Sequence, residues 1–159
     1  MDKILQILHE NARTSASEIA KRLGLAEAEV AAAIEKFEKE KVVLGYQAIM
    51  NPEKCEDGLV IAIIEVKLTP QRGTGFDAIA RRIYKFPEVK VCYLISGDYD
   101  LHVVVQGASL KEVASFVSEK LATIDHVSST STHFILKKYK DFGVMMHGAE
   151  DNDRLAVTP

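Results

Sequence analysis

The chain has 159 residues, of which 47% are hydrophobic and 27% are charged. This balance excludes a disordered chain, and the length allows one ordinary domain or two small ones. The formal net charge of −3 argues against strong non-specific affinity for nucleic acid, because proteins that depend on phosphate contacts are usually basic.

Composition also disfavours metal, secreted and membrane proteins. Cys55 and Cys92 have no metal-ligand spacing, which favours two reduced thiols. The first residues, MDKILQILHE, lack the basic start and the long apolar core of a signal peptide. No apolar run approaches the roughly 18 residues needed to span a bilayer. We therefore expect a cytoplasmic protein with no cofactor and no membrane partner.

The first residues of the chain have the pattern of two short helices. An apolar stripe at helical spacing (4–8) predicts the first one. Ser15, followed three residues later by Glu18, is a capping-box pattern that begins the second, and Gly24 suits the left-handed residue that ends it.

A third helix and an extended segment complete the expected N-terminal domain (1–50). The helix lies within LGLAEAEVAAAIEKFEKE (23–40), with Val30 and Phe37 inward. VVLGYQAIM (42–50) then reads as extended chain with a turn inside it. Three short helices and a strand pair make a winged helix-turn-helix.

A polar linker, NPEKCEDG (51–58), leads to a second half (59–139) in which strands and helices alternate. The expected elements are a strand (59–68), a helix (76–83), two strands (88–96 and 99–107), a helix (110–121) and a last strand (126–139). This order predicts a ferredoxin-like βαββαβ domain, so the expected fold class is α+β. In the tail (140–159), the apolar clusters GVMM and RLAV either dock on a neighbouring subunit or belong to a disordered end.

The strands of the second half carry apolar residues on both faces. In the first strand, Val60, Ala62 and Ile64 alternate with Ile61 and Ile63. Two helices cover only one face of a four-stranded antiparallel sheet, and an exposed apolar patch on the other would be costly in a monomer. We therefore expect copies of the chain to associate through their sheets.

Three features make the chain resemble the Lrp/AsnC, or feast/famine, family of bacterial and archaeal transcription factors. The first is the order of a winged helix-turn-helix, a short linker and a ferredoxin-like domain. The second is the run ILQILHENARTSASEIAKRLGL, later followed by VLGYQAIMNPEK. The third is YLISGDYDLHVVV (93–105), in which Gly97-Asp98-Tyr99-Asp100 matches the most recognisable family motif. The resemblance implies an amino-acid-responsive transcriptional regulator, not an enzyme, assembled as homodimers and commonly as an octamer of four dimers.

The resemblance also implies an effector site between sensor domains, formed by the Gly-Asp hairpin of one subunit and the last strand of another. The corresponding residues are Ser96, Gly97, Asp98, Asp100, Thr130, Thr132, His133 and Phe134. Asp98 or Asp100 can pair with the ammonium of an amino acid, and charge-assisted hydrogen bonds are the stronger kind. The alternatives are a tight turn at Gly97 that Asp100 caps, a polar edge strand at SSTST, and a structural hydrogen-bonded His133.

The expected DNA-reading helix lacks basic residues where it should enter the groove. Its groove-facing residues, after Ala26, are Glu27, Ala28, Ala31, Ala32 and Glu35. Residues able to touch the DNA backbone are Arg13, Lys21, Arg22, Lys36 and Lys39. Alanine can contact thymine methyl groups, and glutamate can accept a hydrogen bond from cytosine. We expect weak DNA binding by each head, strengthened in an oligomer by high effective concentration.

Two alternatives follow from this acidic reading helix. One is a sensor subunit that has weak or lost DNA binding and assembles with DNA-binding relatives. The other is an enzyme that resembles the siroheme decarboxylases, for which His102, His133, Lys137 and Lys138 are available to grip a carboxylated macrocycle. No nucleophile elbow, zinc-binding histidine pair or phosphate loop is present in the sequence.

Overall fold

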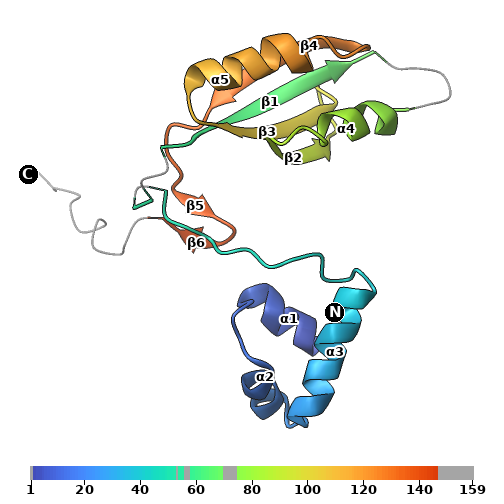
Figure 1. The fold of residues 1–159 in the computed structure, drawn as a ribbon, viewed down its shortest axis with the longest axis vertical. Helices are drawn as coiled ribbons and strands as arrows, with labels where there is room; N and C mark the ends of the chain where they lie inside the picture. Colours follow the sequence, from blue (N-terminus) through green and yellow to red (C-terminus); the bar gives the residue numbers. More distant parts are fainter. Residues whose placement is uncertain (1, 53, 56–57, 70–74, 147–159) are drawn as a thin grey trace, which may run out of the picture. The chain divides into compact units, whose positions relative to one another are not determined.

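The structure is a computed structural model that describes residues 2–52, 54–55, 58–69 and 75–146 (Figure 1). The chain divides into two compact units, residues 1–49 and 50–159. Each unit has its own hydrophobic core.

The first unit contains three helices, α1 (Lys3–Glu10), α2 (Ala16–Leu23) and α3 (Glu27–Lys39). The predicted capping box is confirmed: Ser15 accepts a hydrogen bond from the Glu18 backbone, and the Glu18 side chain accepts one from the Ser15 backbone. Gly24 ends α2 in the left-handed conformation, with φ of 70°. The buried core residues are Ile4, Leu8, Ile19, Ala20 and Val30. The expected helix-turn-helix is therefore present.

The predicted strand pair in 42–50 is wrong. Residues 44–51 have no helix or strand, although Val42 and Val43 stay attached to α3 through hydrogen bonds from their N–H groups to the Phe37 carbonyl. Leu44 is 86% exposed. A two-stranded hairpin has little to bury by itself, so an extended segment without a third strand or a covering helix does not form a stable sheet.

The second unit is built on a four-stranded antiparallel sheet in the order β2-β3-β1-β4. Its elements are β1 (Val60–Leu68), α4 (Asp77–Ile83), β2 (Val89–Leu94), β3 (Leu101–Gly107), α5 (Leu110–Ser115) with its π-helical continuation η1 (Phe116–Leu121), and β4 (Val127–Phe134). The predicted ferredoxin-like βαββαβ order is confirmed (Figure 1). The described strands are shorter than predicted from their apolar patterns. β4, for example, ends at Phe134, which pairs with Ala62 near the start of β1.

The core of this unit lies between the helices and one face of the sheet. Residues of β1 and β3 alternate strictly, so Ile64 and Val103 are fully buried whereas Ile63 and Val104 are only half-buried. Helix residues such as Phe116 complete the core. We call the opposite face of the sheet the outer face. None of the described core residues of this unit covers it.

A small hairpin follows the sheet domain. It pairs β5 (Lys140–Asp141) with β6 (Val144–Met145). The Asn51 side chain donates a hydrogen bond to the Met146 carbonyl at 2.9 Å, which attaches the start of the expected linker to this hairpin. GVMM thus contributes a hairpin strand, whereas RLAV lies outside the described residues.

Candidate DNA-reading and effector sites

The groove-facing residues expected from the sequence lie on the surface of α3. The buried side of the helix carries Val30, with Ala33, Ile34 and Phe37 packed against the same core. Glu27, Ala28, Ala31, Ala32 and Glu35 are all exposed. The structure therefore brings the predicted reading residues together on the solvent side of one helix.

The two lysines of α3 are already engaged by carboxylates one turn away. Lys39 Nζ lies 2.6 Å from Glu35 Oε1, and Lys36 Nζ lies 3.9 Å from Glu40 Oε1. These side chains are more than half exposed, so each pair stabilises the helix by only about 0.3–0.5 kcal/mol. Each carboxylate offsets the positive charge of the lysine that it contacts.

The start of α3 is also poorly prepared for phosphate. Ala26 occupies the N-cap position and makes no side-chain capping bond, in contrast to Ser15 at the start of α2. Glu27 and Glu29 occupy the first turn. Their carboxylates suit the positive end of the helix dipole and oppose an incoming phosphate.

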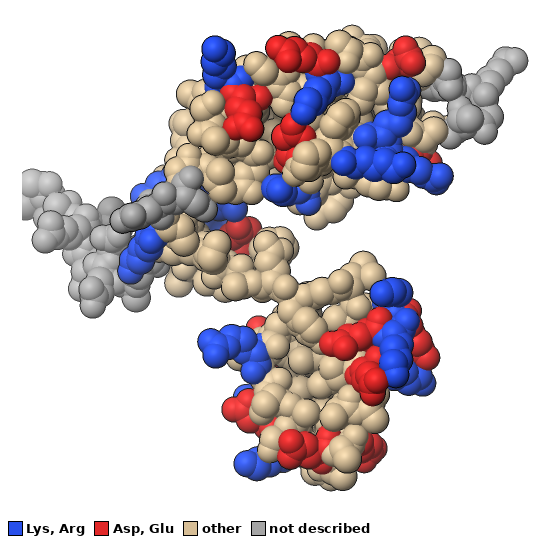
Figure 2. All heavy atoms as spheres, viewed as in Figure 1, with Lys and Arg blue, Asp and Glu red and all other residues tan. Residues whose placement is uncertain are grey.

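The other three residues predicted to touch the DNA backbone lie outside α3. Arg13 is in the turn between α1 and α2, and Lys21 is in the last turn of α2. Arg22 follows Lys21 and is also exposed. On the face drawn in Figure 2, basic and acidic side chains are interspersed over the helical unit rather than gathered by sign.

A groove that was not predicted from the sequence runs between α1 and the segment after α3. Leu5, Leu8 and Ala12 line one side, and residues 42–47 line the other. Tyr46 lies at this segment and donates a hydrogen bond from its hydroxyl to Glu38 Oε1 at 2.9 Å. Burial, followed by this hydrogen bond, raises the pKa of the Tyr46 phenol.

In the sensor unit, the Gly-Asp motif forms the connection between β2 and β3. Gly97 has φ of 148°, a backbone conformation that residues with a Cβ atom rarely adopt. The hairpin is closed by a hydrogen bond from the Ile95 N–H to the Asp100 carbonyl at 2.9 Å. Ser96 and Asp98 are exposed beside Gly97.

The two carboxylates of this motif have different surroundings. Asp100 accepts a hydrogen bond from the Leu68 N–H at 2.7 Å, and its Oδ2 lies 3.7 Å from Lys67 Nζ. Asp98 makes no hydrogen bond or ion pair with the described part of the chain. Asp100 therefore caps the end of β1 rather than its own turn, and Asp98 is the carboxylate of the motif that has no such tie.

The candidate residues on β4 lie on opposite faces of the sheet. Thr130, Thr132 and Phe134 pair in register with Val66, Ile64 and Ala62, which face the helices. His133 pairs with Ile63 and belongs to the outer face. Within one chain, His133 and its neighbours on β4 therefore cannot line the same side of one pocket.

The outer face carries a row of polar side chains across the sheet. In register, Tyr93 on β2 pairs with His102 on β3, His102 with Glu65 on β1, and Glu65 with Ser131 on β4. The rings of Tyr93 and His102 are stacked, with centroids 6.4 Å apart. Neither Tyr93 nor Glu65 was predicted as a site residue from the sequence, although strand alternation places both on this face.

His133 joins this row through hydrogen bonds. Its Nε2 lies 3.3 Å from Glu65 Oε2 and 3.1 Å from Ser131 Oγ. This arrangement fits the structural role that was one of the alternatives for His133.

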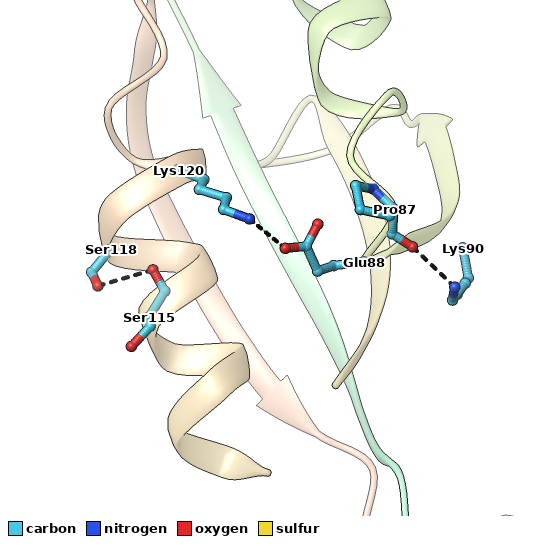
Figure 3. A network of polar contacts seen from close by, with 6 residues as sticks. All are labelled: Pro87, Glu88, Lys90, Ser115, Ser118 and Lys120. Atoms are coloured by element: carbon cyan, nitrogen blue, oxygen red, sulfur yellow. Dashed lines mark hydrogen bonds and ion pairs between the residues drawn. The ribbon is translucent and has the colours of Figure 1, made fainter. Parts of the chain in front are cut away.

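A second polar network ties the sheet to η1 and is unrelated to the candidate sites (Figure 3). Lys120 donates a hydrogen bond to Glu88, and its ammonium lies over the rings of Phe86 and Phe116 at 5.8 and 5.9 Å. The hydrogen bond from Lys120 holds the pKa of the Glu88 carboxyl below its usual value. Lys90 donates to the Pro87 carbonyl at 3.0 Å in the same region.

Cys55 and Cys92 are both free thiols, and burial raises the pKa of the Cys92 thiol. No three His, Cys, Asp or Glu side chains of the described chain are arranged to hold a metal ion.

No helix formed by the described residues has the length and apolar character needed to cross a membrane.

Comparison with known proteins agrees with this architecture. Residues 2–38 match the family model of the AsnC-type helix-turn-helix domain, and residues 61–145 match that of the Lrp/AsnC ligand binding domain. An uncharacterised HTH-type transcriptional regulator of Bacillus subtilis (strain 168), YugG, is 50% identical over 159 residues, which covers 99% of this chain and 95% of the relative. The leucine-responsive regulatory protein of Haemophilus influenzae is 28% identical over 138 residues, covering 87% and 82% of the two chains.

A solved structure of a similar protein adds a ligand complex. The transcriptional regulator NMB0573 of Neisseria meningitidis, crystallised with L-Met, superposes with a TM-score of 0.68 at 27% identity and covers 89% of this chain and 93% of its own. The relatives are named as regulators, so the alternative of a siroheme-decarboxylase-like enzyme is set aside. The chain thus belongs to the Lrp/AsnC family of transcriptional regulators, a non-enzymatic family with a helix-turn-helix DNA-binding domain and a ligand-binding domain.

Proposed function

We propose that this regulator binds DNA as a homo-oligomer and changes its binding when an amino acid occupies its sensor domain. The observation that carries the proposal is the exposed solvent side of α3, presented by a helix-turn-helix that precedes an Lrp/AsnC ligand binding domain. A regulator that reads chromosomal DNA acts in the cytoplasm of a prokaryotic cell, so a cytoplasmic location is part of the proposal.

Assembly is supported by the outer face of the sheet. Ile61, Ile63 and Val104 are half-buried on this face. Burying such residues against a second copy is favourable by about 25 cal/mol for each Å² removed from water. We propose a dimer formed through this face and assembly of dimers into larger oligomers, up to an octamer.

An amino-acid effector is supported by relatives and by the chemistry of the Gly-Asp hairpin. The Neisseria regulator was crystallised with L-Met, and the Haemophilus relative is named leucine-responsive. Asp98 offers an untethered carboxylate for an ammonium group, and exposed backbone N–H groups beside Gly97 offer donors for a carboxylate. Thr130 and Thr132 on β4 of another subunit would complete the site, with Ser96 of the hairpin and with His133 and Phe134 of β4 as its further residues.

Two measurements on the purified full-length protein test this proposal. Light scattering gives the mass of the oligomer with and without a panel of amino acids, and gel shifts with the protein's own upstream DNA measure binding under the same conditions. We expect an oligomer whose mass or DNA affinity changes with one or a few amino acids. A monomer that ignores the whole panel would contradict the proposal.

A second candidate is a sensor subunit that has lost DNA binding and assembles with DNA-binding relatives. It is favoured by the ion pairs of Lys36 and Lys39 and by the glutamates in the first turn of α3. In that case the protein changes its mass with an amino acid but shifts no DNA fragment by itself.

A further inference from the structure

The first two turns of α3 and the turn before them contain no hydrogen-bond donor among their side chains. From Gly24 to Glu35 the sequence is GLAEAEVAAAIE, which contains only glycine, aliphatic residues and glutamate. Helix-turn-helix proteins read base edges mainly with the N-terminal residues of the second helix of the motif. The side chains that should read bases here can therefore accept hydrogen bonds or make apolar contacts, but cannot donate.

This restricts the bases that the helix can distinguish. Guanine presents two acceptors in the major groove and is read by arginine or lysine, and adenine is read by the paired donor and acceptor of asparagine or glutamine. Thymine presents a C5-methyl group that alanine can contact, and the N4 amino group of cytosine donates to a carboxylate. Guanine presents only acceptors at its major-groove edge and is therefore left without a direct contact, whereas thymine offers its methyl group and cytosine, like adenine, offers an amino donor to a carboxylate.

The exposed alanines are spaced to make such contacts together. Ala28, Ala31 and Ala32 are exposed and stand at positions i, i+3 and i+4, so their methyl groups are neighbours on one side of the helix. Glu35 follows one turn later, and its Oε1 lies 2.6 Å from Lys39 Nζ. This ion pair reduces the repulsion between Glu35 and DNA while Oε2 remains available to accept a hydrogen bond.

We propose that α3 recognises DNA through thymine methyl groups, which contact Ala28, Ala31 and Ala32, with Glu35 accepting from a neighbouring cytosine. The inference rests on the proposed DNA binding. It predicts an operator that presents thymine methyl groups and a neighbouring cytosine to this part of the helix, and in which guanine is not read directly by it.

Uracil substitution isolates the methyl group, because uracil differs from thymine only by its absence. The duplex is the segment of the protein's own upstream DNA that the bound protein protects from cleavage. It is prepared once with thymine and once with uracil, and the affinity of the full-length protein for each duplex is measured by competition. Each methyl group buried at an apolar contact is worth about fourfold in affinity, so we expect the uracil duplex to bind about tenfold to sixtyfold more weakly.

Alanine variants connect this difference to α3 rather than to a change in DNA shape. Ala31→Ser and Ala32→Ser should reduce the thymine-to-uracil ratio of affinities, whereas Ala12→Ser, at an exposed position in the turn after α1, should leave it unchanged. Circular dichroism of each variant verifies that the helices remain folded.

The possible failures are distinguishable. Equal affinity for the thymine and uracil duplexes overturns methyl recognition but leaves DNA binding intact. A ratio that persists in both α3 variants also overturns it, because the discrimination then arises elsewhere. If the upstream DNA competes no better than random DNA, the proposed DNA binding itself fails, and methyl recognition fails with it.

Discussion

The carboxylate of Asp100 accepts a hydrogen bond from the backbone N–H of Leu68 at 2.7 Å, across 32 residues of sequence. At Leu68 the pairing of β1 with β4 shifts register, so this N–H lies at an irregular point of the sheet. Asp100 also donates its own backbone N–H to the Val66 carbonyl at 3.0 Å. The family motif thus fastens the β2–β3 hairpin to the end of β1.

Removing this tie should destabilise the sensor unit. Asp100→Ala leaves the Leu68 N–H without its acceptor and the half-buried Lys67 without its counter-charge, which we expect to cost about 1–3 kcal/mol in the free energy of unfolding. Chemical denaturation measures it. Asp98→Ala is the matched control, because an exposed carboxylate without such contacts should change stability by less than about 0.5 kcal/mol. Equal effects of the two substitutions would contradict the structural role of Asp100.

The same two aspartates should also differ in how much they contribute to the response to effector. Asp98→Asn keeps the shape of the hairpin but removes the charge proposed to pair with an ammonium group. We expect the amino-acid-dependent change in oligomer mass or DNA affinity to weaken by about tenfold or more, because hydrogen bonds to charged groups contribute about 1.5–3 kcal/mol. Light scattering across an effector titration measures it, and an unchanged midpoint would show that Asp98 does not contact the effector.

Breaking the ion pair on α3 should strengthen non-specific DNA binding. Glu35→Gln releases Lys39, whose ammonium now lies 2.6 Å from the carboxylate, and removes one negative charge from the reading side. Affinity for random-sequence DNA should rise by about twofold to fivefold per head, the range expected for an exposed charge pair. The control is Glu40→Gln, which releases Lys36 from a looser pair at 3.9 Å and should have a smaller effect. Fluorescence anisotropy at low salt resolves this difference, and a decrease in affinity for Glu35→Gln would refute the neutralising role of Glu35.

The contribution of Glu88 to stability should depend on pH in a defined direction. Its pKa in the folded protein lies below the ordinary value of 4.5, chiefly because Lys120 donates a hydrogen bond to the carboxylate. The resulting stabilisation is present above the ordinary value and is lost as the pH falls through the lowered one. The difference in unfolding free energy between wild type and Glu88→Gln should therefore be largest near neutral pH and vanish in acid. Glu119→Gln, on the exposed side of η1, should show no such trend, and a difference for Glu88→Gln that grows in acid would reverse the assigned sign.

Assembly through the outer face should be sensitive to charge at its centre. Ile63 is half-buried there and pairs with Val104 and His133 on the neighbouring strands. Ile63→Glu should convert the oligomer to monomers at micromolar concentration, because an unpaired charge would be buried in the interface. Lys111→Glu, at an exposed position of α5, is the control. Sedimentation velocity gives the masses, and an intact oligomer with Ile63→Glu would place the interface elsewhere.

The order of helices and strands could be predicted from the sequence because it depends on local periodicity and capping. Ser15, Glu18 and Gly24 specify where α2 begins and ends through contacts within ten residues. The strand pair expected in 42–50 failed for the opposite reason, since an extended segment becomes a strand only when another strand is beside it. The residue pattern indicated extended chain over 42–50, but not whether a partner strand exists in the same chain.

The candidate site was predictable only in part, because its residues act across the sheet. The motif predicted the connection between two strands that contains Asp98 and Asp100, yet nothing local to it indicated that Asp100 binds the backbone at Leu68. The separation of Thr132 from His133 follows from strand alternation alone and was available from the sequence. The row formed by Glu65, His102 and Tyr93 requires the order of strands in the sheet, which no single segment contains.

The internal cancellation of charge on α3 has a consequence for how the protein would behave when a cell loses water and its ion content rises. DNA-binding proteins that rely on many cations release many counterions and lose occupancy steeply under such osmotic stress. A surface that reads DNA as proposed, through methyl groups and a neutralised glutamate, releases few counterions, so its affinity for DNA would change little as the ion concentration rises. Release from DNA would then depend on the proposed amino-acid effector rather than on the water content of the cell.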